Sequence, residues 1–141
     1  LTVIEGDAEK DLLQFPDSSF DFVILSQTLQ AFLTPEIVIK ELLRVGKKAV
    51  VTIPNFGFWK VRLHLLLKGT MPITKNLPDE WYNTPNLHMC TLKDFYNFCE
   101  NRNIKLDQSI ALKNEKISTV NKLNLNIKNL SAELGIFLIE R

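Results

Sequence analysis

The fold is decided by the stretch Phe20-Asp21-Phe22-Val23-Ile24-Leu25-Ser26-Gln27. Residues 22–25 are apolar without alternation, which is typical of a strand covered on both faces in a parallel sheet. Ser26 and Gln27 follow at the carboxyl end of this strand, where open α/β sheets bind ligands. The same two residues could instead cap the next helical segment. The pattern therefore predicts an α/β fold, with either a ligand contact or a helix cap at Ser26 and Gln27.

Length and composition fit a globular domain. The 141 residues are 45% hydrophobic, which is enough for a sizeable core. With 17 basic and 16 acidic residues, the net charge of +1 disfavours binding to nucleic acid or an acidic membrane through bulk charge. Cys90 and Cys99 form no CxxC pair, and we expect free thiols in a cytoplasmic setting. Residues 1–4 open the chain inside a strand-like run, so we expect a fragment: one partial domain over residues 1–141.

Strands and helices alternate through the first half of the chain. Pro35 at a first helical position, after Thr34 as N-cap, predicts a helix through Val45, with Ile37, Val38, Leu42 and Val45 facing a sheet. Thr91 predicts a second capped helix over 92–101. The full series is a strand at 1–4, helix at 8–15, strand at 20–25, short helical or irregular stretch at 28–32, helix at 35–45, strand at 49–53, helix at 58–68, loop at 70–87, helix at 92–101, strand at 104–112, polar excursion at 113–129 and strand at 131–141. The last two strands are expected to form an antiparallel pair.

The predicted helix over 58–68 is apolar on most of its surface. Its polar face is narrow and consists of Lys60, His64 and Lys68 at a spacing of four. Such a helix needs cover on most sides, which favours a buried cap or a partner-binding helix over a helix lying on a membrane.

Five segments carry a resemblance to a known family. They are Leu25-Ser26-Gln27-Thr28-Leu29-Gln30-Ala31, Pro54-Asn55-Phe56-Gly57, Arg62-Leu63-His64-Leu65-Leu66-Leu67-Lys68-Gly69, Met71-Pro72 and Trp81-Tyr82-Asn83-Thr84-Pro85-Asn86. Together they resemble the methionine biosynthesis protein MetW family through nearly the whole chain. The resemblance implies a Rossmann-like class I S-adenosylmethionine-dependent methyltransferase fold: a mostly parallel sheet with helices on both faces and an antiparallel last strand.

The resemblance also indicates which parts of that fold to expect. The glycine-rich turn after the family's first strand and the acidic residue after its second have no counterpart here, so the expected fold lacks the first two strands. Residues 1–4 resemble the third strand. We expect 2–5 either to move beside residues 23–25 or to be poorly ordered.

The resemblance assigns S-adenosylmethionine as the cofactor of the complete protein. Asp7 matches the position that accepts a hydrogen bond from the adenine amino group, with the Ala8 backbone beside it. Ser26 and Gln27 match the loop beneath the sulfonium. No catalytic residue is named, because methyl transfer from an activated sulfonium depends mainly on alignment in a dry pocket.

Aromatic and amide residues are expected over this site. Asn55, Phe56, Trp59, Trp81 and Tyr82 would contact a methyl acceptor or a partner, or would form a hydrophobic lid packed for stability. His88 with Cys90 could suggest a metal site, but two ligands are too few, so none is predicted. Cys99 is expected in the core, and Cys90 partly exposed.

Two functions follow from the resemblance. The first is a methyltransferase of unknown acceptor, which predicts cofactor binding by the complete protein and a pocket between Ser26 and Asn55. The second is a non-catalytic partner or activator of homoserine O-acyltransferase, with the helix over 58–68 as one contact surface. As an enzyme the truncated chain alone is expected to be inactive, and a third possibility is that it does nothing alone.

Overall fold

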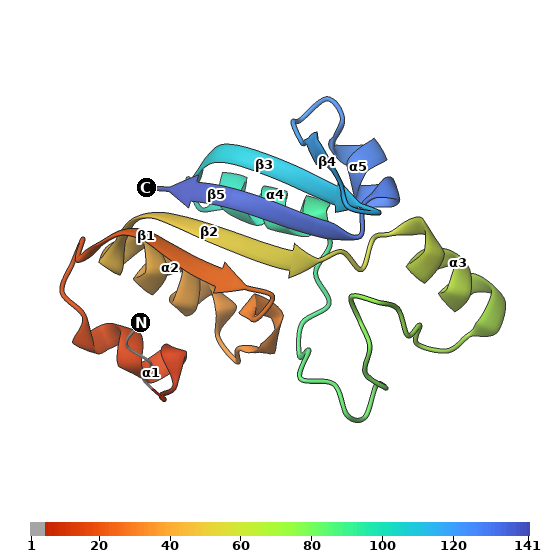
Figure 1. Ribbon diagram of the computed structural model, residues 1–141, viewed down its shortest axis with the longest axis horizontal. Helices are drawn as coiled ribbons and strands as arrows, with labels where there is room; N and C mark the ends of the chain where they lie inside the picture. Colours follow the sequence, from red (N-terminus) through yellow and green to blue (C-terminus); the bar gives the residue numbers. More distant parts are fainter. Residues whose placement is uncertain (1–4) are drawn as a thin grey trace.

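The computed structural model describes residues 5–141, which form a five-stranded sheet in the order β1-β2-β5-β3-β4 (Figure 1). The strands are β1 Phe20–Ser26, β2 Gly46–Pro54, β3 Lys105–Lys113, β4 Lys116–Thr119 and β5 Leu134–Glu140. β1 and β2 are parallel, and β5 runs antiparallel to both of its neighbours, β2 and β3. The strands β1, β2 and β3 therefore run in the same direction. The last strand, β5, lies between β2 and β3 and runs in the opposite direction. This arrangement confirms the expected α/β fold with an antiparallel last strand.

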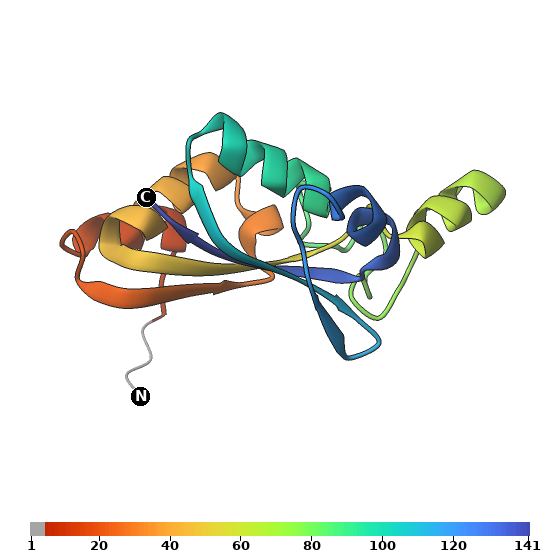
Figure 2. The same cartoon turned by 90° about the horizontal axis from the view of Figure 1, so that it is seen from above.

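The helices connect these strands. They are α1 Ala8–Asp11, α2 Pro35–Val45, α3 Trp59–Lys68, α4 Leu92–Asn101 and α5 Leu125–Ser131, with short 3-10 turns η1 Leu12–Gln14 and η2 Leu29–Ala31. Figure 2 shows α2 and α4 on the same face of the sheet. The chain between α3 and α4 forms a long loop, as predicted, and α3 projects from the end of β2 away from the sheet (Figure 1).

The core lies between the sheet and the helices α2 and α4. Ala49, Val51 and Ile53 of β2 are fully buried on this face, as is Phe137 of β5. The ring of Phe95 in α4 packs on Phe137 with 4.6 Å between ring centroids. Cys99 belongs to the same core, as expected, and Cys90 is half-buried. The apolar alternation of β2 and β5 thus holds both helices on one face of the sheet.

The prediction that β1 is covered on both faces is wrong. Val23 and Leu25 face the helices, opposite Ala49 and Val51, whereas Phe20, Phe22 and Ile24 are exposed on the other face. β1 is also the first strand in the sheet order, so within residues 5–141 it pairs with β2 alone. An unbroken apolar run does not distinguish a strand covered on both faces from one covered on a single face. The implied helices on both faces are accordingly not found within this part of the chain.

The helix α2 begins and ends where the sequence predicts, but its contacts differ. Thr34 occupies the N-cap position without making a side-chain cap bond, because its Oγ1 instead donates to Glu9 Oε1 at 2.6 Å. Ile37 is exposed, so its assignment to the sheet-facing stripe is wrong, while Ile39 and Leu43 are buried. The stripe is therefore shifted around the helix relative to the predicted one.

The second half of the chain confirms some predictions and adds two elements. Thr91 caps α4 through a reciprocal bond pair with Asp94, and β3 pairs with β5 in antiparallel register, both as predicted. The predicted polar excursion over 113–129 is wrong in part, because it contains the strand β4 and most of the helix α5. The expected strand at 1–4 and its placement beside β1 lie outside the described residues. No helix within residues 5–141 is long and apolar enough to cross a membrane.

Candidate cofactor and partner site

The turn after β1 is held in a strained conformation. Gln27 has a φ of 51°, in the left-handed region that side chains other than glycine seldom adopt. Its backbone N–H lies 3.0 Å from the carbonyl oxygen and 2.9 Å from the Oγ1 of Thr52, at the end of β2. Its own carbonyl accepts a 2.7 Å bond from Gln30 Nε2. The turn after β1 is therefore held against Thr52, two residues before the end of β2.

Ser26 and Gln27 do not cap a helix. The N-cap position of η2 is Thr28, and no side-chain cap bond is present there. The alternative of a simple helix cap is therefore wrong. Both side chains are exposed at the carboxyl end of the strand, and their predicted contact with a cofactor stays a prediction.

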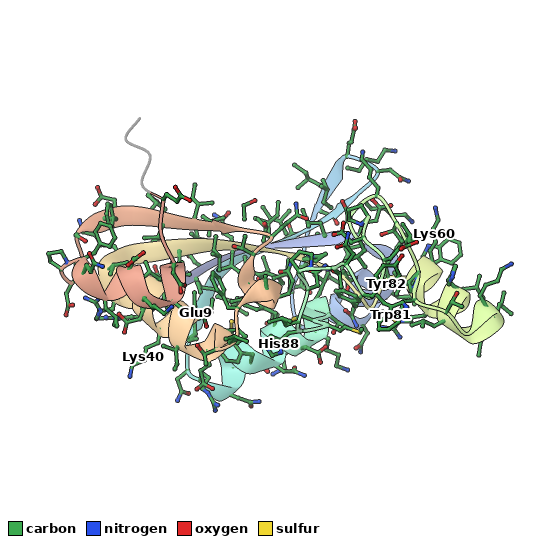
Figure 3. The ribbon with its side chains drawn as sticks, turned by 90° about the horizontal axis from the view of Figure 1, so that it is seen from below. Glu9, Lys40, Lys60, Trp81, Tyr82 and His88 are labelled. Atoms are coloured by element: carbon green, nitrogen blue, oxygen red, sulfur yellow. The ribbon has the colours of Figure 1, made fainter. Side chains whose placement is uncertain are left out.

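Asp7 and Ala8 lie at the start of α1, where Asp7 is the N-cap residue. Asp7 Oδ1 accepts a bond from Glu9 N at 3.0 Å, and its Oδ2 pairs with Lys10 at 2.9 Å. The hydrogen bond from Lys10, followed by the backbone N–H of Glu9, lowers the pKa of Asp7, so this carboxylate stays an acceptor. Glu9 in turn accepts bonds from the N–H and Oγ1 of Thr34, which precedes α2 (Figure 3). This contact ties α1 to the start of α2, and the position of Asp7 and Ala8 relative to Ser26 stays a prediction.

Asn55 has a structural position. Its side chain is 2% exposed, and its Nδ2 donates to the carbonyl oxygens of Asn129 and Ala132, both at 2.8 Å. Its Oδ1 accepts from Gly57 N at 2.9 Å and Leu92 N at 3.3 Å. All the hydrogen-bonding capacity of the amide is used within the chain. Asn55 thus joins β2, α4 and the end of α5, and its predicted contact with an acceptor gains no support from this geometry.

Trp81 and Tyr82, of the predicted aromatic residues, lie near α3 (Figure 3). Phe56 and Trp81 line one cavity of about 260 Å³ together with Met71. The rings of Trp81 and Tyr82 pack edge to face with 5.7 Å between centroids. Trp59 is partly exposed on α3, with Lys60 Nζ 5.8 Å from its ring centroid. The structure therefore brings together residues from three predicted segments, and their contact with an acceptor or partner stays a prediction.

The remaining candidate groups show no catalytic arrangement. Burial raises the pKa of both Cys90 and Cys99 to about 12, so both thiols stay protonated at neutral pH. His64 Nε2 lies 3.1 Å from Thr70 Oγ1. Within residues 5–141 no three side chains of His, Cys, Asp or Glu come together as metal ligands.

Sequence reasoning gave no role to Gln30. It is 5% exposed, its Nε2 supports the Gln27 turn, and its Oε1 has no hydrogen-bond partner within the described residues. The one signal in the sequence that could have pointed to Gln30 is its place in a segment that carries the family resemblance.

The strand order and the antiparallel last strand define the class of protein: an S-adenosylmethionine-dependent methyltransferase fold. A solved Thermotoga maritima structure, described as an S-adenosylmethionine-dependent methyltransferase and possible histamine N-methyltransferase, aligns with a TM-score of 0.64 and 15% identity, over 97% of this chain and 62% of that one. An Archaeoglobus fulgidus S-adenosylmethionine-dependent methyltransferase aligns with a TM-score of 0.51 and 12% identity, over 98% of this chain and 66% of that one. At such identities the likeness shows the fold alone.

Sequence comparison then gives the family. The model of the methionine biosynthesis protein MetW matches residues 1–139, so the chain belongs to the MetW family. A relative from Rhodopirellula baltica, the bifunctional methionine biosynthesis protein MetXA/MetW, is 33% identical over 130 residues, which are 89% of this chain. The chain spans 21% of the length of that relative. The expected family and its methyltransferase-like fold are therefore confirmed.

Proposed function

We propose that this chain acts in methionine biosynthesis as a methyltransferase-fold partner that binds and activates a homoserine O-acyltransferase. The bifunctional relative carries MetXA and MetW in one polypeptide, and MetX proteins are homoserine acyltransferases. Two activities joined in one chain are commonly ones that also work in contact when separate. The proposal places the chain in the cytoplasm as one domain, and its free thiols fit a reducing compartment.

The observation that carries this proposal is the exposed leucine surface of α3. This surface is defined as Leu63, Leu66 and Leu67, which are exposed and lie on one side of the helix at spacings of three and four. The helix itself projects from the end of β2 away from the sheet (Figure 1). Leu66 is 80% exposed and Leu67 is 71% exposed. The helix is anchored to the rest of the chain through Val61, which packs with Phe58 and Leu77. The buried-cap prediction for this helix is therefore wrong.

Such a surface is costly in water. A helix of ten residues gains little stability on its own, and contiguous exposed apolar side chains mark interaction sites. Docking on a partner would remove the leucines from water and hold the helix. Lys60, His64 and Lys68 lie along the same helix, so the complementary surface is apolar with acidic groups at its rim.

A binding experiment with paired variants tests this function. Homoserine O-acyltransferase from the same source would be titrated with the chain and with its Leu66→Ser/Leu67→Ser variant, following association by calorimetry and acyltransferase rate. We expect the unchanged chain to bind and raise the rate, and the double variant to lose both effects while keeping its secondary structure. Leu13→Ser is the matched control, because Leu13 is 64% exposed but lies in η1, far from α3 (Figure 1).

Two results would count against the proposal in different ways. Unchanged affinity of the double variant would exclude the leucine surface as the contact. Absence of any association of the unchanged chain would exclude the partner function itself.

A second function, methyl transfer, is favoured by the strained Gln27 turn. Strained backbone is often found at ligand sites, and this turn follows the carboxyl end of β1. The proposed cofactor is S-adenosylmethionine. Calorimetric titration of S-adenosylmethionine and its demethylated product into this chain, and into a version extended with the family's amino-terminal portion, tests the idea. Binding to the extended version that Asp7→Ala weakens would support a methyltransferase site, and no binding to either version would reject it.

A further inference from the structure

A cavity of about 260 Å³ is formed mainly by the long loop between α3 and α4. Leu77 in its wall is buried in one cluster with Phe58 and Val61, at the start of α3. Leu77 and Thr74 also exchange two backbone hydrogen bonds, of 2.8 and 3.1 Å. This part of the loop is therefore attached to the start of α3, and the cavity wall has a defined position.

The walls of this cavity are apolar and polarisable. Met71, Met89 and Trp81 line it, together with Phe56. A second hollow, of about 520 Å³, shares Met71 and Trp81 with the cavity and adds Tyr82. Trp81 is 73% exposed and Tyr82 is 69% exposed, so both rings are in contact with water (Figure 3). Exposed apolar side chains gathered around a hollow mark a binding surface.

The charged side chains that line the cavity and the second hollow are carboxylates. They belong to Asp79 in the cavity and Glu80 in the second hollow. Both residues are exposed, so a ligand can reach their carboxylate oxygens. The ion pairs found within residues 5–141 include neither of them. Lys75 and Lys68, the nearest lysines along the chain, line neither space, so the two carboxylates are available to a ligand.

This combination of groups selects a positively charged ligand. The faces of aromatic rings and the carboxylates both attract a cation and repel an anion. A metal ion would need more oxygen ligands than two separate carboxylates, whereas thioethers and rings make good contacts with alkyl groups. The positive charge is therefore expected on an apolar body, as in an alkylammonium ion.

We propose that Trp81 and the two neighbouring carboxylates, Asp79 and Glu80, form a binding site for a small organic ammonium ion, whose alkyl groups contact Met71 and Met89. The site goes beyond the proposed function and does not rest on it, because none of the exposed leucines of α3 lines either space. It gives the predicted aromatic residues a class of ligand without requiring that this ligand is methylated. Loss of acyltransferase binding and loss of ammonium binding are therefore separate outcomes.

Three probes of similar size and different charge test the site: choline, neohexyl alcohol and tert-butylacetate. All three carry the same branched head, which is a cation only in choline. The chain contains two methionines, Met71 and Met89, and both line the cavity, so isotope-labelled methionine methyl groups give two resonance signals that report on it. Choline should shift both signals and bind about tenfold more tightly than the neutral alcohol. The anionic tert-butylacetate should bind more weakly than the alcohol.

Two kinds of variant separate the contribution of the carboxylates from that of the ring. Asp79→Asn combined with Glu80→Gln keeps the side-chain shapes and removes the charges, and should lower the ratio of choline to alcohol affinity about threefold. Trp81→Leu keeps an apolar wall without the ring, and should also lower this ratio about threefold. Glu115→Gln and Phe22→Leu are the matched controls and should leave the ratio unchanged, because both residues are exposed and line neither space.

The proposal is overturned by any of three results. These are choline binding that is absent or no tighter than that of the neutral alcohol, choline binding that leaves both methionine signals unchanged, and an unchanged affinity ratio in both kinds of folded variant. If Trp81→Leu does not fold, the double carboxylate variant decides, because Asp79 and Glu80 are exposed and their replacement removes no packing.

Discussion

Gln30 donates from Nε2 to the carbonyl oxygen of Gln27 over 2.7 Å, and this bond closes the turn in which Gln27 has a φ of 51°. The bond satisfies a carbonyl at the end of β1 and fixes the direction of the Gln30 amide. The bond therefore connects the exposed turn that is predicted to contact the cofactor with a side chain that is 5% exposed.

The strain at Gln27 makes the first prediction. Glycine adopts positive φ without steric cost, so Gln27→Gly should leave stability unchanged or raise it by up to about 1 kcal/mol. A β-branched side chain is least compatible with this region, so Gln27→Val should lower the free energy of unfolding by about 2 kcal/mol. Because the Gln27 side chain is exposed, neither change removes packing. Urea unfolding of both variants checks this, and equal stability of the two would contradict it.

The bonds of Asn55 make the second prediction. Asn55→Leu would leave the carbonyls of Asn129 and Ala132 and the N–H of Gly57 without partners in a buried position. We expect the free energy of unfolding to fall by about 3 kcal/mol or more. Asn126→Leu is the matched control, because its amide makes one exposed bond to Lys93. Thermal or urea unfolding that shows similar losses for the two variants would exclude a structural role for Asn55.

Local signals in the sequence were sufficient for much of the fold. Pro35 marks the start of α2, and Thr91 marks the start of α4. These signals depend on residues within one helical turn of each other, so they can be recognised without knowing which elements pack against the helix. The exposed face of β1 could not be predicted, because Phe22 and Ile24 are apolar whether or not a layer covers them.

The hairpin of β3 and β4 was missed for a different reason. Its turn residues, Asn114 and Glu115, both have positive φ, of 46° and 65°. A two-residue hairpin turn of this kind is normally recognised by glycine at the second position, and glutamate gives no such signal.

The candidate site residues were assigned in two ways. Ser26 and Gln27 were indicated by their place after β1 as well as by the resemblance, whereas Asp7 and Ala8 were assigned only by matching family positions. The role of Gln30 in holding the Gln27 turn could not be predicted either, because that bond depends on how the chain folds back after β1.

Gly69 makes the third prediction. It ends α3 with a φ of 66°, and its N–H donates to the carbonyl of Leu65 at 3.0 Å. A Cβ at this position would meet no atom within 4 Å, so Gly69→Ala is penalised by backbone conformation alone, by about 1 kcal/mol. The last turn of α3 should fray, and its amide protons should exchange faster. Gly69→Asn should show a smaller effect, since asparagine tolerates this region better; unchanged exchange in Gly69→Ala would contradict the assignment.

The two cysteines make the last prediction, on pH dependence. Burial favours the neutral thiol and raises the pKa of Cys90 and Cys99 from 9.0 to about 12. The thiolate fraction of the folded chain at pH 8 is therefore about a thousandfold below that of an ordinary cysteine, and iodoacetamide should modify the folded chain very slowly. In urea both thiols should react at the ordinary rate. Since the folded pKa is the higher one, the stability linked to these thiols is fully present below about pH 9 and is lost as pH rises towards 12. Mass spectrometry of timed samples, with Cys90→Ala to separate the two sites, measures both effects, and rapid labelling of the folded chain at pH 8 would show that the thiols are accessible and ionisable.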